Sequence, residues 1–281
     1  TILLSSEGVN MFLAGRRESI DQFLRMVRDI EAFQDLEVKE SFSDEQPFNR
    51  MLVKLKREII AFGVEGIAPA ERTSPKLSAR ELKAWLDAGR PVRLLDTRND
   101  YEVDLGTFRG AERLGIHHFR EFPEAAAARL PEQAKHEPLV MFCTGGIRCE
   151  KAGPMLEQLG FRQVYQLDGG ILKYFEECGG AHYDGGCFVF DSRVVLDPEL
   201  RPTGAVQCFR CQAVLTYEDI QSEKFQFGRS CPHCYRTPEE QRQDRLAARQ
   251  AELSRIASSQ PGSAPYDNRR LIHVPPRLAG L

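Results

Sequence analysis

The sequence has no apolar run long enough to cross a membrane and no basic segment leading into an apolar one at its start. A membrane-spanning helix needs roughly 20 apolar residues, whereas the longest runs here, such as Leu139 to Cys143, have the length of a buried strand. A secretory leader would begin with a basic stretch followed by an apolar one. We therefore expect a soluble cytoplasmic protein with no membrane partner.

The chain also lacks a strong excess of either charge. Its 281 residues include 38 Lys and Arg and 41 Asp and Glu, for a net charge of −3 at pH 7. This balance gives no global attraction to nucleic acid. We expect no DNA partner, and any RNA contact must come from a local basic patch. The length allows two or three domains, each with its own core.

The eight cysteines do not have the spacing of a disulfide framework. Cys208-x-x-Cys211 and Cys231-x-x-Cys234 form two knuckles separated by 19 residues. That spacing is typical of a zinc ribbon, in which four thiolates hold a structural zinc ion. The alternative is four free thiols in a packed small domain. We interpret Cys178 and Cys187, which lie outside the pattern, as core or spare thiols.

Changes in pattern divide the chain into five segments. Residues 1–62 read as an incomplete ferredoxin-like α+β sandwich, because the chain opens within a strand and continues as strands at 9–13, 51–55 and 59–62 around a helix at 19–30. Residues 63–77 are a linker, 78–179 an α/β domain and 180–236 a Cys-rich module. Residues 237–281 begin with a capping box, Thr237-Pro-Glu-Glu240, and form a charged helix and a poorly ordered tail.

Strands and helices alternate between residues 78 and 179. A capping box, Ser78-Ala-Arg-Glu81, starts a helix that ends at Gly89. Strands are predicted at 92–96, 139–142 and 163–167, and helices at 121–130, at 149–159 and after Gly170. This order predicts a parallel α/β sheet with helices on both faces.

The stretch from Cys143 to Cys149 carries the chemistry. A buried strand delivers Cys143 to the carboxyl edge of the sheet, where open α/β folds place their ligands. The following loop turns backbone N–H groups inward, and the next helix adds the positive end of its dipole. This anion cradle consists of Thr144, Gly145, Gly146, Ile147 and Arg148. It predicts a reactive thiolate or persulfide at Cys143 rather than a buried structural cysteine.

Three neighbouring residues have two interpretations each. Asp96 and Arg98 end a strand beside the loop, so they either orient Arg148 or a substrate, or form a structural ion pair. Cys149, at the helix start, either has a lowered pKa and resolves an oxidised Cys143 as a disulfide, or packs under the loop. A cysteine phosphatase is disfavoured, because its loop places five residues between Cys and Arg and this one has four.

Several motifs resemble the rhodanese superfamily: Leu95-Asp-Thr-Arg98, Tyr101-Glu102, Gly106 to Ala111, the loop from Cys143 to Arg148, and Leu167-Asp-Gly-Gly-Ile171. More narrowly, residues 143–151, 169–175 and 185–190 resemble the bacterial rhodanese-domain tRNA uridine hydroxylases. The resemblance implies 5-hydroxylation of the wobble uridine in the tRNA anticodon loop, with molecular oxygen as co-substrate. It also implies that Cys143 is the active-site residue and forms a persulfide. A sulfurtransferase or persulfide carrier is the alternative.

Two positions depart from the superfamily pattern. Thr107 stands where His is common, and we expect it to shape the surface rather than the chemistry. Pro154 falls inside the helix after the loop, where it either kinks the helix or sits near its first turn.

A tRNA substrate requires a basic face. The candidates are Arg242, Arg245, Arg249, Arg255, Arg269, Arg270 and Arg277 near the C-terminus, and Lys54, Lys56 and Arg57 in the first segment. Tyr174 and Phe175 either line a base pocket or pack in the core. His182, Asp184 and His233 mimic an iron-binding set, which we disfavour because His233 lies inside a knuckle.

Overall fold

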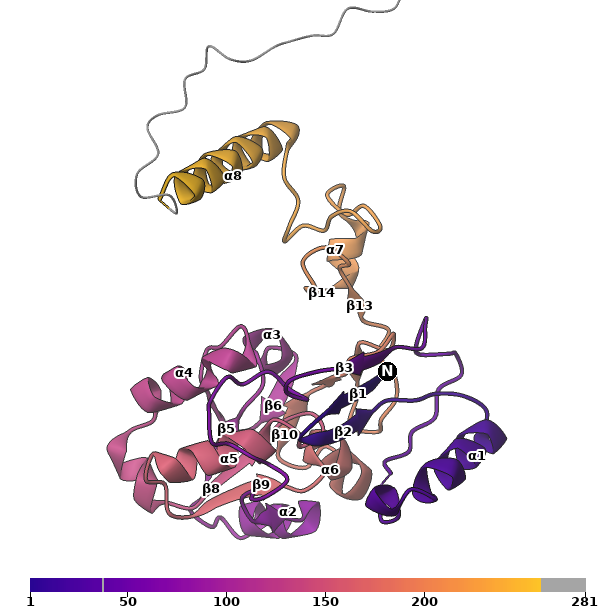
Figure 1. Cartoon of the computed structure of the whole chain (residues 1–281), viewed down its shortest axis with the longest axis vertical. Coiled ribbons are helices and arrows are strands. Elements are labelled where there is room, and N and C mark those ends of the chain that lie inside the picture. Colours follow the sequence, from indigo (N-terminus) through magenta and orange to yellow (C-terminus); the bar gives the residue numbers. More distant parts are fainter. Residues whose placement is uncertain (37, 259–281) are drawn as a thin grey trace, which may run out of the picture.

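A computed structural model describes residues 1–36 and 38–258 (Figure 1). The predicted tail beyond residue 258, with Arg269, Arg270 and Arg277, lies outside the described residues. Within the described residues, no helix combines the length and apolarity needed to span a membrane.

A five-stranded parallel sheet in the order β4-β9-β8-β5-β7 forms the centre of the molecule. Its strands are β4 (Lys76–Leu77), β5 (Arg93–Asp96), β7 (Glu112–Arg113), β8 (Leu139–Phe142) and β9 (Val164–Leu167). The predicted parallel α/β sheet is confirmed. All four residues of β8 are buried, as expected for a strand with a covered sheet on both faces.

Helices cover both faces of this sheet. Residues of α4 (Phe122–Arg129) and α5 (Cys149–Gln158) pack on the face that receives Leu139 and Met141. Residues of α2 (Ala79–Asp87) and α6 (Gly170–Cys178) pack on the face that receives Val140 and Phe142. Consecutive strand side chains point to opposite faces, so one apolar strand supplies both cores.

Short elements connect these units. They are α3 (Asp100–Val103), β6 (Gly106–Phe108) and the 3-10 turns Phe119–Glu121 and Glu132–His136. The predicted capping box at Ser78 is confirmed, with Ser78 and Glu81 exchanging hydrogen bonds at the start of α2. The predicted box at Thr237 is confirmed in the same way.

The N-terminal segment contains a second, three-stranded sheet in the order β2-β1-β3. It comprises β1 (Ile2–Ser5), β2 (Gly8–Met11) and β3 (Val53–Leu55), with α1 (Arg17–Arg28) and a 3-10 turn (Glu31–Phe33) between β2 and β3. The strand predicted at 59–62 is wrong, because these residues form a bend and irregular backbone rather than a strand. Phe62 instead stacks on Phe119, with ring centroids 4.9 Å apart, so its apolar character serves the contact with the core of the central domain.

After α6 the chain forms three short antiparallel strand pairings. β10 (Tyr183–Gly185) pairs with β6, β11 (Cys187–Phe188) with β12 (Val195–Leu196), and β13 (Val206–Gln207) with β14 (Val214–Leu215). The last pair, together with α7 (Tyr217–Gln221), carries the knuckles and projects away from the central sheet, followed by α8 (Pro238–Ser258) (Figure 1).

Pro154 lies in the middle of α5, which continues past it. Proline has no N–H, so the carbonyl of Glu150 one turn earlier loses its helical partner. The hydroxyl of Thr73 donates to that carbonyl at 3.5 Å. A hydrogen bond from the linker therefore compensates for the proline.

Candidate active site

Cys143 lies directly after β8, at the carboxyl edge of the sheet, and its side chain is 1% exposed. The loop from 144 to 148 turns back over it before α5 begins at Cys149. Gly146 has φ +98°, a conformation that favours glycine, and its N–H donates to the Cys143 sulfur at 3.1 Å. The loop therefore places a backbone donor on the sulfur.

These contacts stabilise the sulfur as an anion. Burial alone would raise the pKa of Cys143. A hydrogen bond from Cys149, the charge of Arg148, and the backbone N–H groups of Arg148 and Gly146 outweigh burial and lower the pKa to about 5. At neutral pH the thiolate is the favoured form, which is the nucleophilic form of cysteine.

Cys149 is a protonated thiol in this arrangement. Burial, and then the hydrogen bond to the neighbouring Cys143 thiolate, raise the pKa of Cys149 well above its ordinary value. Of the two interpretations of Cys149, the structure agrees with a thiol packed under the loop and not with a lowered pKa, because the Cys143 sulfur is the one stabilised as an anion. Thr97 Oγ1 lies 3.7 Å from the Cys149 sulfur and fixes it from the other side.

Arg148 is held by a carboxylate that sequence reasoning did not assign. Glu102 of α3 receives two hydrogen bonds from the Arg148 guanidinium, at 2.5 and 2.7 Å, and both side chains are buried. Glu102 also accepts from Thr144 Oγ1 at 3.4 Å. One carboxylate thus fixes both ends of the cradle loop. The sequence contained a signal for this role, because Glu102 belongs to the motif Tyr101-Glu102 and a buried arginine needs an acidic partner.

Asp96 and Arg98 bind each other rather than Arg148. Arg98 donates to Asp96 at 2.6 and 2.9 Å, and both are buried. Of the two interpretations, the structure has the ion pair. Thr107, expected on the surface, instead donates to Asp96 at 2.8 Å, and Arg98 also donates to the carbonyl of Gly106. The network fastens β6 to the end of β5 beneath the site.

The motif Leu167 to Ile171 and the N-terminal segment hold the loop from 144 to 148 in place. The N–H groups of Ile171 and Leu172 donate to the carbonyls of Cys143 and Thr144. A Cβ at Gly170 would lie 2.5 Å from the Cys143 carbonyl oxygen, so only glycine fits. Lys39 Nζ bridges the carbonyls of Gly145 and Gly169, at 2.8 and 3.1 Å, and thereby ties the residues before β3 to the active loop.

An exposed aromatic ring lies beside the cradle. Phe190 is 60% exposed, and the Arg148 guanidinium lies 5.9 Å from its ring centroid. Phe190 packs edge-on against buried Phe188, which in turn contacts Tyr101. The ring is thus supported by Phe188, and more than half of it is exposed to solvent.

The four knuckle cysteines converge. Their sulfurs all lie within 4.8 Å of one another, with pairs at 3.5 Å (Cys211 and Cys231) and 3.8 Å (Cys208 and Cys234). Four thiolates around zinc, with Zn–S bonds of about 2.3 Å, are roughly 3.8 Å apart. The donor set therefore fits zinc. In residues 1–36 and 38–258 no other His, Cys, Asp or Glu group has this geometry.

The remaining candidates are spread over the molecule. Tyr174 and Phe175 are buried in the core between α2 and α6, so they do not line a pocket. His182 contacts Asp87, and His233 contacts Asp219, so the iron-like set is not assembled. The exposed basic candidates are Lys54, Lys56, Arg57, Arg242, Arg245, Arg249 and Arg255.

Comparison with known proteins agrees with this geometry. A rhodanese-like domain model matches residues 78–177, and a model described as a UPF0176 acylphosphatase like domain matches residues 1–59. The solution structure of a rhodanese-like domain from Anabaena is 24% identical and covers 40% of this chain and 80% of its own, with a TM-score of 0.34. The family-model match over residues 78–177 shows that the central domain is a rhodanese-like domain.

Longer matches identify the family. A protein of Cupriavidus necator named tRNA uridine(34) hydroxylase is 53% identical over 239 residues, which are 83% of this chain and 84% of that protein. A protein of the same name from Burkholderia ambifaria is 53% identical over 243 residues, covering 83% and 85%. The chain belongs to the tRNA uridine(34) hydroxylase family, and the resemblance drawn from its motifs is confirmed.

Proposed function

We propose that this protein hydroxylates the wobble uridine of tRNA at carbon 5, with molecular oxygen as co-substrate and Cys143 as its essential sulfur. The observation that carries the proposal is the cradle that holds Cys143 as an anion, in a chain that is 53% identical over most of its length to proteins named tRNA uridine(34) hydroxylase. The enzyme would act on the anticodon loop, in the cytoplasm where tRNA is modified.

Each residue of the site has a role in this proposal. Cys143 acts as the nucleophile, as a thiolate or as a terminal persulfide. Arg148 and the N–H groups of the loop stabilise its negative charge, and Glu102 positions Arg148. Phe190 offers an open ring face on which the splayed uridine stacks, because a base must leave its neighbours to be modified.

Asp96 and Arg98 support the site from below, and Cys149 donates to the reactive sulfur. The four knuckle cysteines would hold one structural zinc ion, for which their spacing is suited. Zinc in this closed set of thiolates would stabilise the fold of its module rather than take part in the reaction.

A sulfurtransferase or persulfide carrier is the second candidate. The observation in its favour is the size of the cradle, which has four residues between Cys143 and Arg148 and a backbone donor 3.1 Å from the sulfur. This geometry suits a single sulfur anion. Such an enzyme would need the same thiolate, so the products must separate the two functions.

The test uses nucleosides from the tRNA of cells grown under ¹⁸O₂, in which either the wild-type chain or Cys143→Ser is the sole copy. We expect 5-hydroxyuridine with ¹⁸O in the wild type and its loss in the variant. Unlabelled 5-hydroxyuridine would exclude molecular oxygen as the source. Retained 5-hydroxyuridine in the variant, together with lost thiosulfate:cyanide activity, would favour the sulfur carrier.

A further inference from the structure

The knuckle segment, residues 206–236, presents two aromatic rings to solvent. Phe209 is 65% exposed and Phe227 is 76% exposed. Their rings meet edge to face, with centroids 5.3 Å apart. The small core of this segment is built from other residues, including Leu215 and Phe225. The two rings therefore form an outward-facing pair whose free faces are available for stacking.

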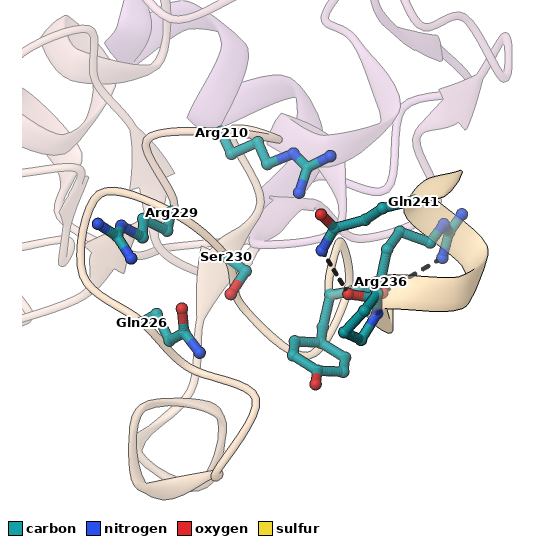
Figure 2. A pocket seen from close by; sticks show the side chains of 8 residues that line it. Arg210, Gln226, Arg229, Ser230, Arg236 and Gln241 are labelled. Carbon is teal, nitrogen blue, oxygen red and sulfur yellow. Dashed lines mark hydrogen bonds between the residues drawn. The ribbon is translucent and has the colours of Figure 1, made fainter. Parts of the chain in front are cut away.

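The same two loops carry two arginines. Arg210 follows Phe209, and Arg229 comes two residues after Phe227. Both are exposed, and neither forms an ion pair with any residue of the described ranges 1–36 and 38–258. With Arg236, at the approach to α8, they line a hollow of about 340 Å³ whose lining has no carboxylate (Figure 2).

The acidic residues of α7 do not line this hollow. Glu218 and Asp219 lie on α7, where Asp219 accepts from the backbone at the helix start and pairs with His233. A second hollow, of about 250 Å³, is lined by Arg210, Gln241, Asp244 and Arg245. Asp244 pairs with Arg236 at 3.8 Å, so the basic surface that continues onto α8 includes one carboxylate. The result is a local cationic surface on a chain whose net charge is −3.

Exposed aromatic faces beside arginines match the chemistry of unpaired RNA. Arginine binds phosphate oxygens, and an open ring stacks on a base. We propose that Phe209, Phe227, Arg210 and Arg229 form a surface that binds tRNA outside the target nucleotide. The knuckle segment projects from the domain that holds Cys143 (Figure 1). This surface would therefore bind a part of the tRNA that lies away from the target nucleotide. That the RNA is tRNA rests on the proposed function.

The test measures binding of unmodified tRNA to the full chain at several salt concentrations. Replacing both arginines (R210A/R229A) should weaken binding at least about tenfold and reduce the salt slope of log K by about 1.5, for two lost phosphate contacts. Replacing both rings (F209A/F227A) should weaken binding about tenfold without changing the slope. R120A/R162A removes two exposed charges from the rhodanese-like domain and should leave binding within twofold.

Zinc content and the urea midpoint of each variant should equal those of the wild type. Wild-type affinity and slope in both double variants would overturn the surface, as would an equal loss in R120A/R162A. Hydroxylation assays separate the two proposals. If wild-type chain binds tRNA through this surface but forms no 5-hydroxyuridine, the proposed function fails and the surface stands. If hydroxylation occurs with an unchanged KM in both double variants, the surface fails and the function stands.

Discussion

Three contacts outweigh burial and keep the Cys143 sulfur ionised. Cys149 donates to it, Arg148 supplies a positive charge that Glu102 holds in place, and Gly146 donates through its backbone. In a buried site each of these contacts is stronger than it would be at the surface. A buried arginine and glutamate beside the sulfur therefore belong to one functional unit.

Removing the charge of Glu102 should destabilise the fold, because Arg148 and the loop depend on this carboxylate. Glu102→Gln leaves Arg148 buried without a counter-charge, and breaking such a pair costs about 3–5 kcal/mol. We expect a lower urea midpoint, measured by the fluorescence of Trp85, the single tryptophan, which lies in α2. Glu124→Gln, on the exposed side of α4, is the matched control and should not shift the midpoint. An unshifted midpoint in Glu102→Gln would rule out the pair as the support of the loop.

The open ring of Phe190 should contribute to substrate binding. Phe190→Ala removes the stacking face, and one base stacked on an aromatic ring is worth about 1–3 kcal/mol. We expect kcat/KM for tRNA to fall about tenfold, with the urea midpoint unchanged because the ring is exposed. Phe190→Tyr, which keeps the face, should restore the rate to within twofold. An unchanged kcat/KM in Phe190→Ala would remove this ring from the proposed site.

Sequence reasoning predicted the anion-binding loop around Cys143 but not the residues that support it. Cys143 and its loop are local features, readable from a strand, two glycines and a helix start. Glu102 is separated from Arg148 by 46 residues, and Lys39 from Gly145 by 106. Such contacts depend on how elements pack, which a local pattern does not contain. The two interpretations of Cys149 stayed open for a related reason, because which of two neighbouring thiols is ionised depends on contacts that a local pattern does not contain.

At the scale of elements, α5 links the active loop to the N-terminal segment. Lys151, in the first turn of α5, is buried and contacts Glu7 at 2.6 Å and Glu58 at 2.8 Å. It also donates to the carbonyl of Ile60. One lysine thus joins the turn after β1, the segment after β3 and the helix that starts at the cradle.

Lys151→Met should loosen this junction. The variant leaves two carboxylates facing each other, which we expect to cost about 2 kcal/mol, less than a fully buried pair because both keep some water. Faster proteolysis within residues 63–75 and a lower urea midpoint are the expected readouts. Lys173→Met, whose partners Glu176 and Glu177 lie at the surface, is the control and should behave as wild type. Equal proteolysis of both variants would contradict the role of Lys151.

Long periodic elements were predictable, and short ones were not. The strand at 139–142 and the helix after the loop were predicted almost to the residue, because burial on two faces leaves a clear apolar pattern. β4, β6 and β7 contain only two or three residues each, too few for any period. Residues 59–62 are as apolar as a strand, but Phe62 stacks on Phe119 and no strand forms.

At the scale of the whole molecule, zinc should stabilise the knuckle segment independently of the rhodanese-like domain. We expect one zinc per chain, and chelation should release four thiols and expose residues 206–236 to protease. The Trp85 urea midpoint should not change, because the core around α2 and α6 shares no residue with the knuckle core. Less than one metal per chain, with all eight thiols titratable, would refute the zinc site.

The central claim is that the fold keeps the sulfur of Cys143 ionised at neutral pH. The most direct test is the thiolate absorbance near 240 nm of wild-type chain minus Cys143→Ser from pH 4 to 9, since the six cysteines outside the loop cancel in the difference and burial raises the pKa of Cys149 in both proteins. Because the pKa is lowered, the signal should be absent at the acid end, rise through a midpoint near pH 5 and be complete at pH 7. A midpoint near 8.5, that of a free cysteine, would contradict the account.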